Sequence, residues 1–229
     1  MKKLYYLIFI ILIIIVLSSL LMSTLFYIDN KKIEVSFKKT NSVGNEFSNG
    51  DVIYTYRKKY NNEDIIGILV IEGLNINELV VKGVDNSYYL NHLVDGNVSV
   101  LGSIFMDYRS DVSSKQINIY GHNSRYYDVV FKRLEKYLDK DFYKSNRYIS
   151  LITVDDVFNY EIFSVNVTDS ENHLDFSSSF NDRVKFLKTN SLYDTGVDVS
   201  DDDYLLVLQT CIYNRSGGLL VISAKKVNF

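Results

Sequence analysis

The pattern of hydrophobic and polar positions divides the chain into three parts. The first thirty residues are predominantly apolar, and residues 31–62 are polar, rich in Lys, Asn and Ser, and poorly periodic. From residue 63 onward, short apolar runs alternate with Gly, Asn and Asp, which is typical of β-strands joined by turns. We therefore expect an N-terminal anchor at 1–30, a tether at 31–62 with some helix around Val52–Tyr60, and a β-rich domain at 63–229.

The apolar N-terminal segment has the length of a membrane-spanning helix. No charged residue lies between Leu4 and Ile28, and about 20 apolar residues suffice to cross a bilayer. A cleaved signal peptide is the alternative, but its apolar region is normally shorter and ends in a site such as Ala-x-Ala, which this segment lacks. The expected topology is a single-pass membrane protein with a cytoplasmic N-terminus and the rest of the chain outside the cell.

The third part of the chain predicts about eight strands and two helices. The expected strands are Ile66–Ile71, Ile76–Val81, Gly102–Met106, Gln116–Tyr120, Tyr148–Val154, Phe158–Val167, Tyr204–Thr210 and Leu219–Lys226. The two helices, at Tyr127–Leu138 and Phe180–Tyr193, repeat apolar residues at helical spacing. Eight strands suit a small barrel whose interior is filled by side chains. The predicted fold is mainly β, an eight-stranded barrel with helices inserted in its connections.

Composition excludes several classes of function. The net charge of −3 argues against a nucleic-acid-binding protein, which would favour a clustered basic face. A single cysteine excludes an intrachain disulfide and any multi-cysteine metal site. The three histidines show no ligand-like spacing, and the acidic run Asp201–Asp203 is interpreted as a solvated turn. We expect no metal and no cofactor.

The strongest chemical candidates are one thiol and one imidazole. Cys211 ends the apolar run Tyr204–Thr210, and His122 follows a second strand-like run, Ile117–Tyr120. A thiol is a useful nucleophile as its thiolate, which a nearby imidazolium stabilises. The same imidazole can protonate a departing amine, so such a pair can serve acyl transfer. The alternative is that Cys211 is a small hydrophobic residue of the core.

The sequence around both residues resembles that of sortases, the Gram-positive transpeptidases that attach proteins to the cell wall or to pilins. The run Leu208–Cys211 (Leu-Gln-Thr-Cys) is similar to their Leu-x-Thr-Cys signature, and Tyr120–Asn123 (Tyr-Gly-His-Asn) is similar to their histidine motif. Phe105–Arg109 and Asp85–Leu90 resemble runs found in class B members. The resemblance spans about Ile65–Lys226, and several motifs agree in order and spacing.

This resemblance implies a sortase-type barrel and a set of site residues. Cys211 is expected to attack the Thr–Gly carbonyl of a sorting signal and form a thioacyl-enzyme, with His122 as the acid and base. Thr210, Gln209 and Asn123 are expected to bind substrate. The implied partners are surface proteins or pilins that carry the signal, and an amine of a peptidoglycan precursor or of a pilin lysine.

One position departs from the family pattern. Sortases place an arginine at the start of the last strand, and Leu219 stands there in this chain. Arg215, in the preceding turn, is the nearest arginine and could supply the planar cation that holds substrate and oxyanion. The alternative is that Arg215 is a solvated turn residue. If Arg215 does not serve, the enzyme is weakened, dependent on another donor, or inactive, which leaves a sortase-like binding domain as the first alternative function. A structural surface domain with a core Cys211 is the second, independent alternative.

Overall fold

The structure, a computed structural model, comprises two compact units, Met1–Ser48 and Asn49–Phe229. The residues that it describes are 6, 9, 11–21, 24, 49–169, 177–213 and 217–228. In the first unit the described residues are helical. Within the described part of the chain, no helix has both the length and the apolar character needed to cross a membrane.

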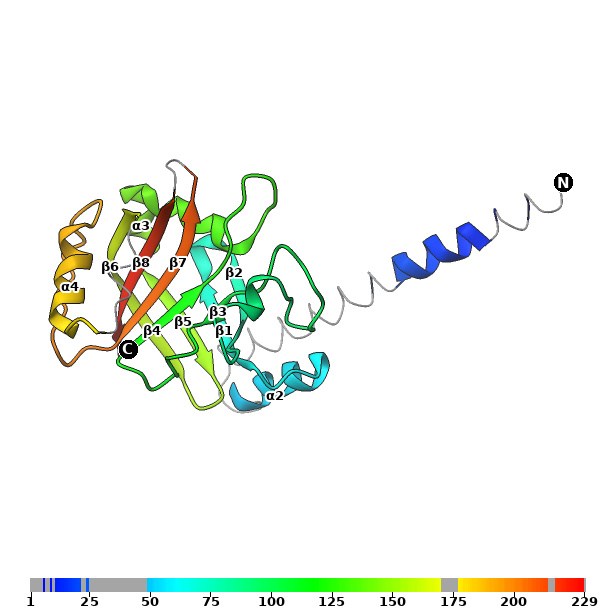
Figure 1. Cartoon of the computed structure of the whole chain (residues 1–229), viewed down its shortest axis with the longest axis horizontal. Coiled ribbons are helices and arrows are strands. Elements are labelled where there is room, and N and C mark those ends of the chain that lie inside the picture. The colour runs from blue at the N-terminus through cyan, green and yellow to red at the C-terminus, as the bar shows by residue number, and fades with distance from the viewer. Residues whose placement is uncertain are drawn as a thin grey trace. The chain divides into compact units, whose positions relative to one another are not determined.

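The second unit is a closed β-barrel (Figure 1). Its described residues form eight strands, joined in the order β1-β2-β3-β4-β7-β8-β6-β5, with β5 returning to β1. The strands are β1 Ile65–Ile71, β2 Ile76–Val81, β3 Phe105–Met106, β4 Gln116–Tyr120, β5 Tyr148–Thr153, β6 Val157–Thr168, β7 Leu205–Ile212 and β8 Gly218–Val227. Most neighbours are antiparallel, but β2–β3 and β4–β7 are parallel. The predicted mainly β, eight-stranded fold is confirmed.

Side chains alternate between the inside and the outside of the barrel. On β7, Leu206 and Leu208 belong to the main buried cluster, whereas Leu205 and Val207 belong to a second cluster on the opposite face. This alternation follows from the two-residue period of a strand. Gln209 and Cys211 continue the outer face toward the end of β7.

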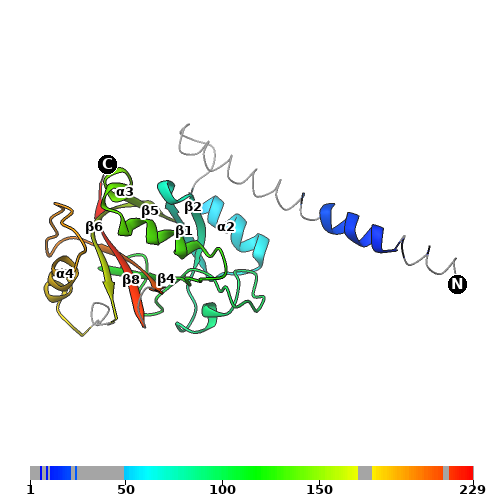
Figure 2. The same cartoon turned by 90° about the horizontal axis from the view of Figure 1, so that it is seen from above.

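Helices cover separate parts of the barrel. α4 packs Val184 and Leu187 on the outer cluster, and α2 buries Val52 and Ile53 and contacts β1. The two helices lie on opposite sides of the barrel (Figure 2). The helical segments are α2 Asn49–Tyr60, η1 Glu72–Leu74, η2 Tyr88–Leu90, η3 Val130–Leu138, α3 Lys140–Ser145 and α4 Phe180–Thr189, the η segments being 3₁₀-helices. The helix expected around Val52–Tyr60 is confirmed and begins three residues earlier.

Three sequence-based elements differ from the structure. The strand predicted at Gly102–Met106 keeps only the two residues of β3, because Gly102 has a positive φ of 56° and ends a turn from Ser99. The helix predicted at Tyr127–Leu138 begins at Val130 and is a 3₁₀-helix. The helix predicted to reach Tyr193 ends at Thr189, because the Leu192 N–H leaves to bond the Val165 carbonyl of β6.

Candidate active site

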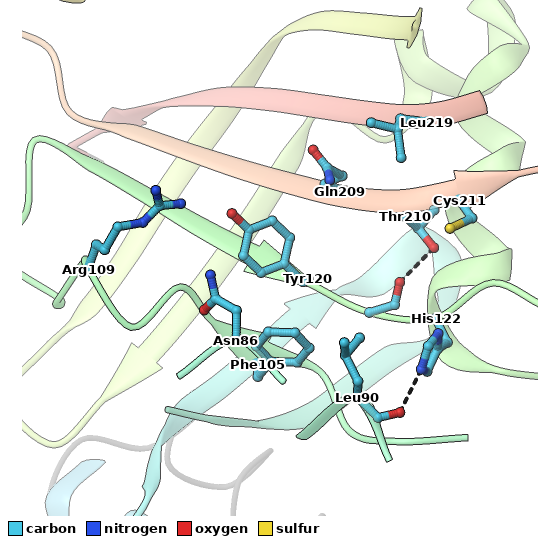
Figure 3. Close-up of a pocket in the computed structure, with 11 residues that line it drawn as sticks. Asn86, Leu90, Phe105, Arg109, Tyr120, His122, Gln209, Thr210, Cys211 and Leu219 are labelled. Carbon is cyan, nitrogen blue, oxygen red and sulfur yellow. Dashed lines mark hydrogen bonds between the residues drawn. The ribbon is translucent and has the colours of Figure 1, made fainter. Parts of the chain in front are cut away.

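A pocket of about 470 Å³ lies at the ends of β4 and β7. The start of β8 and the segments 86–90 and 105–109 complete its lining. Four of the six residues that the sequence singled out line this pocket, namely Cys211, Thr210, Gln209 and His122. Figure 3 shows the sulfur of Cys211 and the ring of His122 at one end, with Arg109 toward the other.

The register of two parallel strands brings the thiol and the imidazole together. Tyr120 of β4 lies opposite Gln209 of β7. His122 and Cys211 each follow two residues later, so the two strands deliver them to the same rim of the barrel. Cys211 is exposed, and a core thiol, which the structural-domain alternative requires, is therefore excluded. On its other side Cys211 pairs with Leu219 of β8, so an apolar side chain lies across from the thiol.

His122 is oriented by a backbone carbonyl. Its Nε2 lies 2.7 Å from the carbonyl oxygen of Leu90, in the loop that forms the opposite wall (Figure 3). A carbonyl can only accept, so Nε2 carries the hydrogen and the neutral ring keeps its free acceptor on Nδ1. This bond selects the tautomer and the ring orientation, which is the part that a carboxylate plays in other nucleophile–histidine pairs.

Thr210 and Gly121 fasten the two strand ends to each other. The Thr210 hydroxyl donates to the carbonyl of Gly121 at 2.7 Å (Figure 3), and the Gly121 N–H donates to the Gln209 carbonyl at 3.2 Å. A Cβ on Gly121 would lie 2.7 Å from Phe131 and 2.8 Å from Ile104, so a side chain there requires both neighbours to move. The glycine of the Tyr-Gly-His-Asn motif thus serves close packing directly before His122.

A buried carboxylate organises the far end of the pocket. Asp107, whose side chain is 0% exposed, accepts two bonds from the Arg109 guanidinium at 2.9 and 2.7 Å. It also accepts from Tyr120 Oη at 2.7 Å and from Asn86 Nδ2 at 3.1 Å. Burial acts to raise the pKa of Asp107, but the hydrogen bonds outweigh burial and lower it to about 2. The charged carboxylate therefore holds three residues that line the pocket.

Asn123, in contrast to these four sequence-predicted residues, is not among the residues that line the pocket. Asn123 is buried, and its Nδ2 donates to the Glu135 carboxylate at 2.6 Å and to the carbonyl of Cys211 at 2.8 Å. Arg215 lies outside the described residues. The described residues contain no group of three or more His, Cys, Asp or Glu able to hold a metal ion.

Sequence reasoning did not name the wall residues Asn86, Leu90, Phe105, Arg109 and Tyr120 as site residues. The signal was present, because these residues belong to the runs at 85–90 and 105–109 and to the histidine motif, all of which resemble class B sortases. Without the barrel, however, nothing in the sequence places these runs against Cys211. Their role as the pocket wall becomes visible only through the connections that bring β3 beside β4.

Comparison with known proteins identifies relatives over most of the chain, although no protein-family model matches it. The chain is 33% identical over 175 residues to sortase B of Listeria monocytogenes, covering 72% of this chain and 71% of that protein. It is 30% identical over 174 residues to sortase B of Staphylococcus aureus, covering 72% and 70%.

Solved structures show the same fold. A mutant form of Clostridium perfringens sortase B matches with a TM-score of 0.72 at 28% identity, over 78% of this chain and 87% of that one. The Staphylococcus aureus sortase B–substrate complex matches with a TM-score of 0.75 at 25% identity, over 86% and 92%.

Proposed function

Because the chain belongs to the sortase family and is class B-like, we propose that this transpeptidase is anchored in the cell membrane and cleaves a C-terminal sorting signal between Thr and Gly. The observation that carries the proposal is the shared rim of β4 and β7. It presents an exposed thiol, Cys211, beside His122 in a pocket of about 470 Å³.

In the proposed reaction the thiol of Cys211 first gives its proton to Nδ1 of His122, and the resulting thiolate attacks the carbonyl carbon of the signal's threonine. The tetrahedral intermediate collapses, the C–N bond to glycine breaks, and His122 gives its proton to the departing amine. A thioester between Cys211 and threonine remains. An incoming amine then attacks this thioester and His122 accepts the proton of the amine. The thiolate leaves and takes that proton back from His122, which restores the enzyme.

The proposed partners are a surface protein or pilin that carries the signal and an acceptor amine of a peptidoglycan precursor or of a pilin lysine. The Staphylococcus aureus relative supports a bound substrate at this fold, since its solved structure is a substrate complex. The pocket sets the signal's preference, and its wall combines apolar Leu90, Phe105 and Leu219 with polar Asn86 and Arg109. We therefore expect a signal with both apolar and hydrogen-bonding side chains.

Mass spectrometry tests the proposed function directly. Residues 49–229, which form one compact unit, are incubated with a library of Thr–Gly peptides and with triglycine or a lysine-containing peptide as acceptor. The expected result is a thioacyl adduct on Cys211 and a transfer product joined at threonine. A library that yields neither the adduct nor the product would refute the proposal.

A second candidate is a domain that binds sorting signals without transferring them. The position across from Cys211 favours it, because Leu219 cannot donate a hydrogen bond to an oxyanion where the family has an arginine. The two candidates differ in one measurable step. A binder retains the peptide intact, whereas a transpeptidase forms the thioester.

We predict that Arg215 supplies the missing cation. Removing one charge-assisted oxyanion donor costs roughly 2–4 kcal/mol of transition-state stabilisation, so Arg215→Ala is expected to lower kcat/KM by a factor of about 30 to 10³. Arg215→Lys should restore only part of the rate, because an ammonium lacks the planar fork. Steady-state kinetics on a cleavable Thr–Gly peptide measures both variants.

Arg133→Ala is the matched control for Arg215. The Arg133 guanidinium bonds the Asn75 carbonyl at 2.9 Å and does not line the pocket, so the control variant is expected to keep wild-type turnover. Unchanged turnover in Arg215→Ala would exclude Arg215 as the donor. Leu219→Arg should then be tested in the same assay, since it restores the family residue directly across from the thiol.

We also predict that the N-terminal segment acts only as an anchor. No charged residue interrupts Leu4–Ile28, and the compact barrel unit begins at Asn49. Deleting residues 1–30 is therefore expected to move the protein from the membrane fraction to the soluble fraction with its peptide cleavage rate unchanged. A truncated protein that fails to fold, as judged by thermal unfolding, would contradict a purely anchoring role.

A further inference from the structure

The pairing of β4 with β7 ends before it reaches the reactive residues. The last residues in register are Tyr120 and Gln209, and the last main-chain bond joins the Gly121 N–H to the Gln209 carbonyl. His122 and Cys211 lie beyond this point. The main chain of the sheet alone therefore does not determine how far apart their side chains lie.

Side chains continue the alignment where the main chain stops. The Thr210 hydroxyl bonds the Gly121 carbonyl, and Asn123 Nδ2 bonds the carbonyl of Cys211 itself at 2.8 Å. One step further, the Tyr213 hydroxyl donates to the Asn123 carbonyl at 2.9 Å. These three bonds link the chain on both sides of His122 to the chain on both sides of Cys211.

Asn123 occupies the centre of this arrangement and is 4% exposed. Its two partners, the Glu135 carboxylate and the Cys211 carbonyl, are both acceptors. Only the NH₂ group can satisfy them, so the orientation of the amide is fixed by chemistry. Its Oδ1 is buried with no hydrogen-bond partner in the described structure.

We propose that Asn123 is a positioning residue that sets the distance between the thiol of Cys211 and the ring of His122. The Asn123 amide donates a hydrogen bond to the carbonyl of Cys211, and its main chain directly follows His122. Glu135 on η3 accepts a second hydrogen bond from the same amide and fixes its orientation. This role replaces the substrate-binding role expected from the sequence, and it rests on the proposed transpeptidase function.

The test uses Asn123→Asp and Asn123→Ala in the same peptide transfer assay. Asp keeps the shape of Asn but loses the donor, and Ala loses both bonds without adding charge. Small misplacements of reacting groups cost up to about 10²-fold in rate. We therefore expect kcat to fall about 10- to 100-fold, with KM close to the wild-type value because Asn123 does not line the pocket. Should the Asp variant fail to fold, the Ala variant carries the test.

Asn190→Asp is the matched control. Asn190 also donates its Nδ2 to a main-chain carbonyl, that of Phe186 at 2.8 Å, but it is exposed at the end of α4. This variant undergoes the same chemical change and is expected to keep wild-type kinetics. A loss of kcat of the same size in Asn190→Asp would overturn the proposal.

The separate effects on kcat and on KM distinguish a positioning role from substrate binding and from no role. A raised KM with unchanged kcat would indicate that Asn123 binds substrate. Unchanged kcat and KM would indicate that Asn123 has no role in the reaction. Either result overturns the proposal. A rate loss that matches the unfolded fraction seen in thermal unfolding also overturns it. A wild-type protein without transfer activity would instead refute the proposed function, which the control assay on the wild type reveals first.

A double-variant cycle gives an independent readout. If Asn123 acts by aligning His122 with the thiol, then adding Asn123→Ala to His122→Ala should cause little further loss in the rate of thioacyl formation. Coupled residues deviate from additivity, whereas independent ones do not. Fully additive losses would overturn the positioning role.

Discussion

Cys211→Ala is expected to abolish both cleavage of a sorting-signal peptide and transfer to an amine. The chain contains one cysteine, so no other thiol can form the thioester. Because Cys211 is exposed on the outer face of β7, the loss of its sulfur should change the free energy of unfolding by about 0.5 kcal/mol or less. Thioacyl formation, measured by mass spectrometry, and the melting temperature are recorded on the same preparation.

Two outcomes would contradict this prediction. Transfer activity that survives in the alanine variant would show that the thiol is not the nucleophile. A large drop in melting temperature would indicate that the thiol contributes to packing. Alkylation of the folded wild-type protein provides the positive control, since an exposed, activated thiol reacts without denaturation and a packed one does not.

The sequence predicted the barrel because each strand carries its own signal. Gln116–Tyr120 alternates polar and apolar residues, as the pleat of a strand with one apolar face requires, whereas Tyr204–Thr210 contains the continuous apolar run Leu205–Leu208 of a strand buried on both faces. The strand order does not follow in this way. β4 lies beside β7 in parallel, about 90 residues apart in sequence, and no local pattern specifies that pairing. This pairing is the step that brings His122 beside Cys211.

The helical elements were predicted less accurately than the strands, for a different reason. The pattern at Tyr127–Leu138 has helical spacing, but Ser124 accepts bonds from the N–H groups of Tyr126 and Tyr127 and holds them in a turn instead. α3, Lys140–Ser145, was not predicted, because six residues are too few for an apolar period. Its signal was the cap, since Asp139 accepts a bond from the Asp141 N–H.

The candidate site, like the fold, was predicted only where the signal is local in the sequence. Cys211 and His122 were predicted from motifs in which a thiol and an imidazole indicate a nucleophile and an acid and base. The Asp107 network and the Asn123 contact with the Cys211 carbonyl were not, because they depend on which backbone groups are close in space. The sequence assigned Asn123 to substrate from its place in the motif. In the structure its amide instead donates a hydrogen bond to the carbonyl of the nucleophile and does not line the pocket.

His122→Ala is expected to lower turnover by at least about 10²-fold, the lower range for a positioned acid and base. The variant keeps the thiol but removes the group that protonates the glycine amine. His92→Ala is the matched control: its Nδ1 also lies 2.8 Å from a main-chain carbonyl, that of Tyr88, but it does not line the pocket. Steady-state kinetics on one Thr–Gly peptide compares the two variants, and His92→Ala should retain wild-type rates.

The role of His122 as an acid can be separated from a role in binding by changing the leaving group. An ester analogue, in which an oxygen replaces the glycine nitrogen, departs with far less need for a proton than an amine does. The rate loss in His122→Ala should therefore be smaller for the ester than for the amide peptide. Equal losses on both substrates would show that His122 acts before the bond breaks, through thiolate formation or binding. Activity within a few-fold of wild type on the amide would mean that another group moves the proton. The Leu90 carbonyl, which bonds Nε2 at 2.7 Å, makes Nδ1 the nitrogen available for proton transfer in this mechanism.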